Sequence, residues 1–228
     1  MLICFDIDGT LMRDTEDTPA IFTEALRPLL GFDPSAGDEE HGVTDLKEIR
    51  DLFTWNGLTE SEANGRLPEA IEALGETTER HAAEIRAGRV LCPGAEAAVE
   101  KLAAESAALC LLTGNTRRRA TVKLGDLPLA RSLRVGGPGG YGESSVHRAD
   151  LVALAWEECG AGEDEDMVLV GDTPADVAAA KLNGVGSVAV CTGAFGEGDL
   201  GAADVVLPDL AHPGAVESIL GAARPFRL

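Results

Sequence analysis

Short apolar runs, each ending in a cluster of polar residues, recur along the chain. Residues 2–5, 107–112 and 167–170 are three such runs, and residues 187–191 and 205–207 have the same character. Runs of this length without polar alternation are typical of strands that are buried on both faces, as in a parallel sheet. The pattern therefore predicts five buried strands.

Helical patterns lie between these runs, at residues 93–104, 116–124, 149–159 and 175–183. Gly184 follows the last of them and is a natural helix stop. Strands that alternate with helices of this length predict an α/β fold with a doubly wound parallel sheet. In such folds ligands bind beyond the carboxyl ends of the strands, which is where the polar clusters fall.

Residues 14–90 differ in character, because they hold helical patterns and no convincing strand. An apolar stripe over residues 21–30 predicts a first helix, and the apolar residues from Leu67 to Ile85 predict a long fourth one. The residues that can cap helix starts here are Thr18 with Pro19, Thr44, and Thr59 with Glu62. The segment is therefore predicted to be an all-helical cap domain (14–90), inserted into a core made of residues 1–13 and 91–228.

The charge balance excludes some classes of partner. The chain carries 39 acidic residues against 19 Lys and Arg, a formal net charge of −20. This disfavours nucleic acids and anionic membranes as partners, and it requires any phosphate site to carry its own local positive charge. The only basic run, Arg117 to Arg119, is predicted to be a solvated, surface-paired face, since its three side chains point in different directions on a helix.

Cysteine usage and the first residues favour a cytoplasmic protein. The five cysteines form no CxxC pair, and several lie in apolar runs, so they are predicted to be buried, reduced thiols. The chain opens on Met-Leu-Ile-Cys-Phe-Asp, where a signal peptide would need its charged and apolar regions. No window approaches the apolar length of a membrane span, so membrane insertion is not expected. The oligomeric state is not predicted.

Closely spaced aspartates point to a metal site. Asp6 and Asp8 are separated by one residue at the end of the first predicted strand. Two carboxylates this close repel each other unless a cation or a shared proton relieves them. Mg²⁺ can do so, because it takes oxygen ligands in an octahedral shell. Asp172 can add a third carboxylate, and Asp176 can contribute through water or by holding a neighbour.

The same residues suit phosphoryl transfer to a carboxylate. That reaction needs a nucleophile, positive charge on the transferring group, and a proton for the departing oxygen. Asp6 is the candidate nucleophile, and Asp8 can protonate the leaving oxygen and then activate a water molecule. Arg148 is the best-placed cation and could bridge the phosphate and Asp6.

Further residues can bind the substrate. Thr113 can donate its hydroxyl to a phosphoryl oxygen, and the amides of Gly114 and Asn115, at a helix start, add donors. In the cap, Thr44 starts a helix whose amino terminus could face the crevice, and Lys47 on that helix could contact the distal group of a substrate. The simpler interpretation is that Thr113 is a helix N-cap and that the cap helix is an ordinary capped helix.

Three segments together resemble a known superfamily. DIDGT at residues 6–10, LLTGN at 111–115 and GDTPAD at 171–176 are similar to the first, second and fourth motifs of the haloacid dehalogenase superfamily. The resemblance implies a Rossmann-like core, an aspartyl-phosphate mechanism with Mg²⁺, and a helical cap inserted after the first motif, as in phosphoglycolate phosphatases. It also implies Asp6 as nucleophile, Asp8 as acid and base, Thr113 as phosphate ligand and Asp172 as metal ligand.

The chain departs from the superfamily pattern at the third motif. A lysine followed by proline is usual there, whereas this chain has His147-Arg148-Ala149. Arginine keeps the charge with a different geometry, and Lys123 is the alternative for this role. Asp8 favours phosphate chemistry, because the dehalogenases of the superfamily lack a second aspartate.

The sequence thus predicts a Mg²⁺-dependent phosphohydrolase that acts on a small phosphorylated metabolite, of the phosphoglycolate or sugar-phosphate type. A phosphosugar mutase of the β-phosphoglucomutase type is one alternative, since it would share the chemistry of Asp6. A non-catalytic binding domain that retains the fold is the other.

Overall fold

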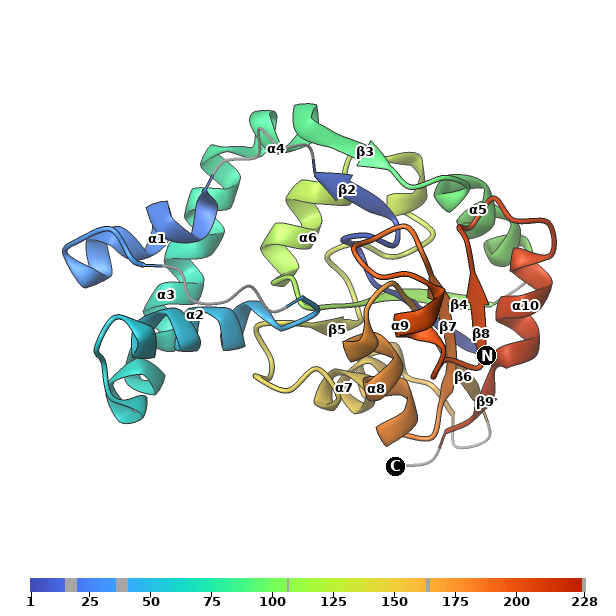
Figure 1. Ribbon diagram of the computed structural model, residues 1–228. Coiled ribbons are helices and arrows are strands. Elements are labelled where there is room, and N and C mark those ends of the chain that lie inside the picture. Colours follow the sequence, from blue (N-terminus) through green and yellow to red (C-terminus); the bar gives the residue numbers. More distant parts are fainter. Residues whose placement is uncertain (15–19, 36–40, 106, 163–164, 227–228) are drawn as a thin grey trace.

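The computed structural model describes residues 1–14, 20–35, 41–105, 107–162 and 165–226. The predicted helix cap at Thr18 and Pro19 lies outside the described residues. The described chain forms a parallel sheet with helices on both faces, and a group of helices to one side of it (Figure 1).

Six parallel strands form the main sheet in the described part of the chain. Their spatial order is β5 (Gly140–Tyr141), β4 (Ala108–Thr113), β1 (Leu2–Phe5), β6 (Asp166–Gly171), β7 (Gly186–Val190) and β8 (Val205–Leu207). A short antiparallel strand, β9 (Arg224–Pro225), also pairs with β6. The five predicted strands are confirmed, and β5 was missed because it is a two-residue strand that begins with glycine.

Helices cover both faces of this sheet, as predicted. On one face α5 (Ala95–Ala104) and α10 (Ala215–Ala222) bury their apolar sides together with side chains of β1, β4 and β6. On the other face α7 (Asp150–Cys159) and α8 (Pro174–Leu182) pack on the alternate side chains of the same strands. The remaining short elements beside the sheet are α6 (Arg117–Leu124), the 3-10 helix η1 (Pro128–Ala130) and α9 (Glu197–Leu200).

The helical segment between β1 and α5 has a hydrophobic core of its own. It contains α1 (Ile21–Leu30), α2 (Asp45–Trp55), α3 (Glu60–Arg80) and α4 (Ala82–Gly88). Apolar residues of all four helices bury one another, and Val122 of α6 joins this cluster. Helices α3 and α4 both contact α6, so α6 is one place where the helical segment packs on the rest of the molecule (Figure 1).

The third and fourth predicted helices of this segment are one helix. The capping box at Thr59 and Glu62 starts the 21-residue α3, which continues through Pro68 to Arg80. A proline inside a helix removes one backbone hydrogen bond, and packing of the apolar face offsets that loss here. The prediction of separate helices was therefore wrong, and the helix also ends earlier than expected, since α4 begins after His81.

A two-stranded antiparallel sheet joins the helical segment to the rest of the chain. It pairs β2 (Met12–Asp14) with β3 (Arg89–Leu91). These strands lie at both expected boundaries of the cap, where no strand had been predicted. The division into a core of residues 1–13 and 91–228 and a cap of residues 14–90 stays a prediction.

Within the described residues, no helix combines the length and apolarity needed to cross a bilayer. All five cysteines carry free thiols. Cys4, Cys92 and Cys110 are buried as predicted, whereas Cys159 and Cys191 are partly exposed.

Candidate active site

Three strand ends that are distant in the sequence meet at the centre of the sheet. β1 lies between β4 and β6, with Phe5 in register with Leu111 and with Val170. Asp6 therefore follows β1 at the same edge where Thr113 ends β4 and Asp172 follows β6. The parallel sheet thus places the three predicted motifs side by side.

Three buried carboxylates gather at this edge. Ligand oxygens of Asp6, Asp172 and Asp176 all lie within 4.8 Å of one another, and all three residues are buried. Gly9 permits this crowding: it has a left-handed φ of 81°, and a Cβ there would lie 2.1 Å from Asp172 Oδ2. Thr10 Oγ1 donates to Asp172 Oδ1 at 3.1 Å. A side chain larger than hydrogen at residue 9 would therefore displace the carboxylate.

Arg148 is the buried cation beside this cluster. Its Nη2 lies 2.9 Å from Asp6 Oδ1 and 2.6 Å from Asp176 Oδ1. Its Nη1 donates to the backbone carbonyl of Gly42 at 3.1 Å, so it also holds a loop of the helical segment. Asp176 serves two purposes, because its Oδ2 accepts from the backbone and side chain of Thr173 and thereby caps α8.

One arginine does not balance three carboxylates. Burial raises the pKa of Asp6 to about 6, despite the opposing effect of Arg148. Burial and the charges of Asp6 and Asp176 raise the pKa of Asp172 to about 8. Carboxyl pKa values this high mean that the cluster resists ionisation unless another cation joins it. A divalent cation with a preference for oxygen ligands fits this set of donors.

Asp8 lies outside this acidic cluster. Its Oδ1 accepts from Lys123 Nζ at 2.6 Å and its Oδ2 accepts from Asn115 Nδ2 at 2.7 Å. Partial burial alone would raise the pKa of Asp8, but Lys123 and Asn115 outweigh it and hold the pKa below its usual value. Asp6 and Asp8 therefore occupy different electrostatic environments, although only one residue separates them.

Thr113 and the residues after it form a compact loop. Thr113 is fully buried, and its Oγ1 accepts from the backbone and side-chain nitrogens of Asn115 at 3.3 and 3.0 Å. The N-cap of α6 is Thr116, so the simpler interpretation of Thr113 as an N-cap was wrong. Gly114 approaches the helical segment so closely that a Cβ there would lie 2.1 Å from the Val43 carbonyl oxygen.

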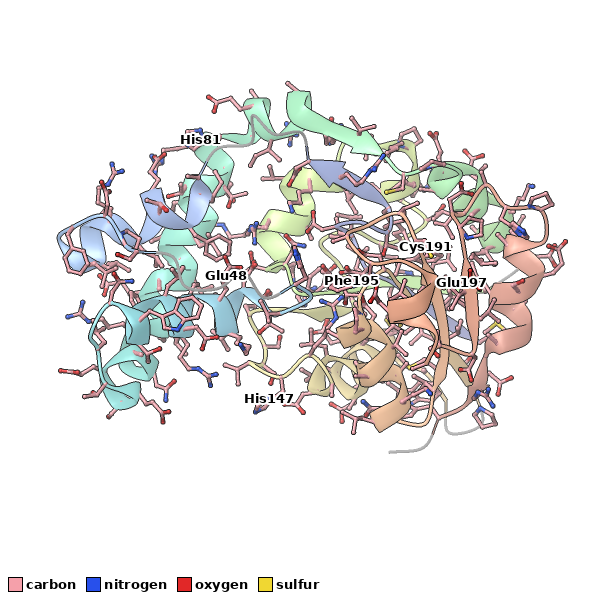
Figure 2. The ribbon with its side chains drawn as sticks, in the orientation of Figure 1. Glu48, His81, His147, Cys191, Phe195 and Glu197 are labelled. Atoms are coloured by element: carbon pink, nitrogen blue, oxygen red, sulfur yellow. The ribbon has the colours of Figure 1, made fainter. Side chains whose placement is uncertain are left out.

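A cavity of about 570 Å³ opens beside these groups. The helical segment lines it with Phe22 and Glu48, among other residues, and the rest of the chain contributes Phe195, Arg119 and Lys123. Figure 2 labels Glu48 on α2 and Phe195 in the loop after β7. A pocket of this size suits a small molecule. Its lining includes basic side chains such as Arg119, Lys123 and Arg148, but carboxylates outnumber them, so a bound cation would still be needed to attract a phosphate group.

Asp45 connects the helical segment to α6. Its buried carboxylate accepts from Thr116 N at 2.6 Å and forms an ion pair with Arg119, while its backbone N donates to the Gly114 carbonyl at 2.7 Å. The guanidinium of Arg119 also lies over the ring of Phe22, 4.7 Å from its centroid. Arg117 and Arg118 form surface ion pairs as predicted, but Arg119 faces the cavity.

A family comparison decides the class of this protein. The profile of the haloacid dehalogenase-like hydrolases matches residues 1–184, which include the acidic cluster, Asp8 and Arg148. The chain belongs to the haloacid dehalogenase-like hydrolase family. Its three motifs are thus those of a hydrolase of this family, as the sequence resemblance predicted.

Individual relatives of this hydrolase are phosphatases or share its fold. Phosphoglycolate phosphatase 1 of Pseudomonas aeruginosa is 27% identical over 201 residues, covering 84% of this chain and 70% of that protein. The crystal structure of a hydrolase from Pseudomonas syringae is 26% identical, with a TM-score of 0.61 over 92% of this chain and 94% of that one. CbbY from Rhodobacter sphaeroides in complex with phosphate shares the fold at 21% identity, with a TM-score of 0.61 over 96% and 98% of the two chains.

The predicted cap residues of this hydrolase have other contacts. Thr44 is fully buried, and its side chain accepts from Lys47 N as the N-cap of α2. Lys47 Nζ forms an ion pair with Asp51 at 2.7 Å on the same helix. Neither residue is among those that line the cavity in the described part of the chain, and their role as substrate ligands stays a prediction. Asp45, directly after Thr44, has the more central position.

Proposed function

We propose that this haloacid dehalogenase-like hydrolase releases phosphate from a small phosphomonoester through a phosphoryl intermediate on Asp6. One observation carries the proposal: the two aspartates of the first motif, Asp6 and Asp8, contact different partners. Asp6 lies against Arg148 and the acidic cluster, whereas Asp8 lies between Lys123 and Asn115. Two carboxylates kept in different environments can serve as nucleophile and as acid and base in one reaction.

In the proposed first step, a carboxylate oxygen of Asp6 attacks the phosphorus atom and the ester P–O bond breaks. Asp8 gives a proton to the leaving oxygen as the alcohol departs. The negative charge of the bound phosphate, next to Asp8, counteracts the effect of Lys123 and favours the protonated form. In the second step Asp8 takes a proton from water, the water oxygen attacks the phosphorus, and the bond from phosphorus to Asp6 breaks.

Other residues of the site would bind and orient the phosphoryl group. Arg148 can reach its oxygens while it holds Asp6, and the loop offers the Thr113 hydroxyl and the Gly114 amide as donors, whereas the Asn115 amide already donates to Thr113 Oγ1. The residues proposed to hold Mg²⁺ are Asp6, Asp172 and Asp176. The Asp8 carboxylate, which the sequence also predicted as a ligand, lies outside this group and accepts from Lys123 and Asn115 instead. When bound there, Mg²⁺ neutralises charge that develops on the transferring phosphoryl group.

The substrate is proposed to be phosphoglycolate or a sugar phosphate. The name of the Pseudomonas aeruginosa relative supports the first, and the cavity volume of about 570 Å³ suits both. The test is phosphate release from a panel of such esters with and without Mg²⁺, followed by borohydride reduction of quenched enzyme and peptide mass analysis. We expect Mg²⁺-dependent release and modification at Asp6. Conversion of a sugar phosphate to its isomer without phosphate release would indicate a mutase instead.

Mg²⁺ is expected to stabilise the wild-type fold and to have little effect on Asp172→Asn. A ligand at 100 times its Kd stabilises by about 2.7 kcal/mol, which for a chain of this size raises Tm by about 5–10 °C. In EDTA the variant is expected to melt higher than the wild type, because it removes one of three crowded carboxylates. Thermal melts in EDTA and in Mg²⁺ measure both effects.

The exposed Asp33 offers a matched control for this substitution. Asp33→Asn should show the full Mg²⁺-dependent rise of the wild type. A rise of wild-type size in Asp172→Asn would contradict the assignment of Asp172 as a ligand.

A further inference from the structure

Lys123 occupies an unusual place for a lysine. It lies in the last turn of α6, and only 6% of its side chain is exposed. Its Nζ lies 2.6 Å from Asp8 Oδ1 and 3.6 Å from Asp14 Oδ2. Its backbone carbonyl accepts from Arg89 Nη1 at 2.6 Å. Both the backbone and the ammonium group of Lys123 are therefore held in place.

The contacts of Lys123 define the orientation of Asp8. Each oxygen of the Asp8 carboxylate accepts one short hydrogen bond, from Lys123 on one side and from Asn115 on the other. These two donors, one on α6 and one in the loop before it, fix the plane of the carboxylate as well as its position. The Asp8 side chain nevertheless remains 44% exposed, and it lines the cavity together with Lys123.

Fold stability alone gives a weak reason for such a pair. The cost of removing an ammonium group from water cancels much of the attraction that an ion pair gains in a poorly solvated place. An ion pair that served only to hold α6 against the core would not require a partly exposed Asp8 carboxylate that faces the cavity. Arg148 already provides the cation beside Asp6, so the two catalytic aspartates have one basic partner each.

We infer that Lys123 is a positioning residue that aims the Asp8 carboxylate at the leaving oxygen of the substrate. This inference rests on the proposed function, in which Asp8 supplies that proton. Lys123 does not then replace Arg148 in the third-motif role. The chain uses both cations, one to hold the nucleophile and one to orient the acid.

The dependence of the rate on the leaving group tests this inference. 4-Nitrophenolate departs without a proton, whereas phenolate needs one, so only phenyl phosphate requires a well-placed acid. In Lys123→Met we expect kcat/KM to fall about 100-fold for phenyl phosphate, as is typical for misplaced catalytic groups. For 4-nitrophenyl phosphate the fall should stay below about threefold. Lys123→Arg, which keeps the charge, should recover part of the loss.

A double substitution separates positioning from a general effect. If Lys123 acts through Asp8, adding Lys123→Met to Asp8→Asn should leave kcat/KM for phenyl phosphate unchanged, because the acid is already absent. The exposed Lys101 on α5 provides the control, and Lys101→Met should behave as wild type. Should Lys123→Met fail to fold, Lys123→Gln allows the same comparison.

Two results would overturn the inference. One is an equal fall in kcat/KM for both esters, which would show that Lys123 does not act through the acid. The other is a further loss in the Asp8→Asn background. Absence of Mg²⁺-dependent turnover of either ester by the wild type would instead count against the proposed function, so the two failures can be told apart.

Discussion

Replacement of Asp6 by asparagine is expected to lower kcat for phosphomonoester hydrolysis by about 10⁴-fold or more, without loss of the fold. An amide of the same shape cannot form the acyl phosphate, and removal of a covalent nucleophile is among the largest single effects seen in enzymes. Stability should not fall, because the substitution removes one of three crowded acidic groups and leaves Arg148 paired with Asp176. Initial rates and thermal melts measure the two effects.

Asp33→Asn provides the matched control for this experiment as well, since Asp33 is an exposed aspartate that pairs with Arg27. It should retain the wild-type kcat. Borohydride reduction should modify residue 6 in the wild type and in the control, and should leave the Asp6→Asn protein unmodified. Turnover of Asp6→Asn above about 1% of the wild-type rate would contradict the role of Asp6 as nucleophile.

The strand ends could be predicted from the sequence because the relevant signals are local. Apolar runs of four to six residues indicated buried strands, and parallel strands necessarily present their carboxyl ends at one edge of a sheet. The convergence of Asp6, Thr113 and Asp172 follows from that rule alone. Their central position in the sheet depends on strand order, which the hydrophobic pattern could not supply.

Contacts across the boundary between the helical segment and the rest of the chain could not be predicted in this way. Asp45 reaches Arg119 only because the first residue of α2 lies beside the start of α6, and no local pattern encodes that arrangement. The pairing of Lys123 with Asp8 joins residues 115 positions apart. The sequence did carry one signal for the inward position of Arg119. Consecutive side chains on a helix point about 100° apart, so one of the three arginines from Arg117 to Arg119 can face inward.

Substitution of Arg148 by methionine is expected to destabilise the fold and to impair catalysis together. The change leaves Asp6 and Asp176 buried and without their basic partner, beside the buried carboxylate of Asp172. Removal of one partner from a buried ion pair costs about 3–5 kcal/mol, which for a chain of this size corresponds to a fall in Tm on the order of 10 °C. In saturating Mg²⁺ kcat should fall by about 10³-fold, since a cation beside the phosphoryl oxygens is lost.

Arg148→Lys distinguishes the charge of Arg148 from its geometry. A lysine ammonium group is a point charge on a flexible stem, whereas the planar guanidinium reaches Asp6, Asp176 and the Gly42 carbonyl at once. The lysine variant should therefore recover most of the Tm in thermal melts but only part of kcat. Wild-type kcat in Arg148→Met would contradict the role of Arg148 in the third motif. If Lys123→Met then lowered kcat/KM equally for 4-nitrophenyl and phenyl phosphate, that role would pass to Lys123, because a cation on the phosphoryl group acts whatever the leaving group.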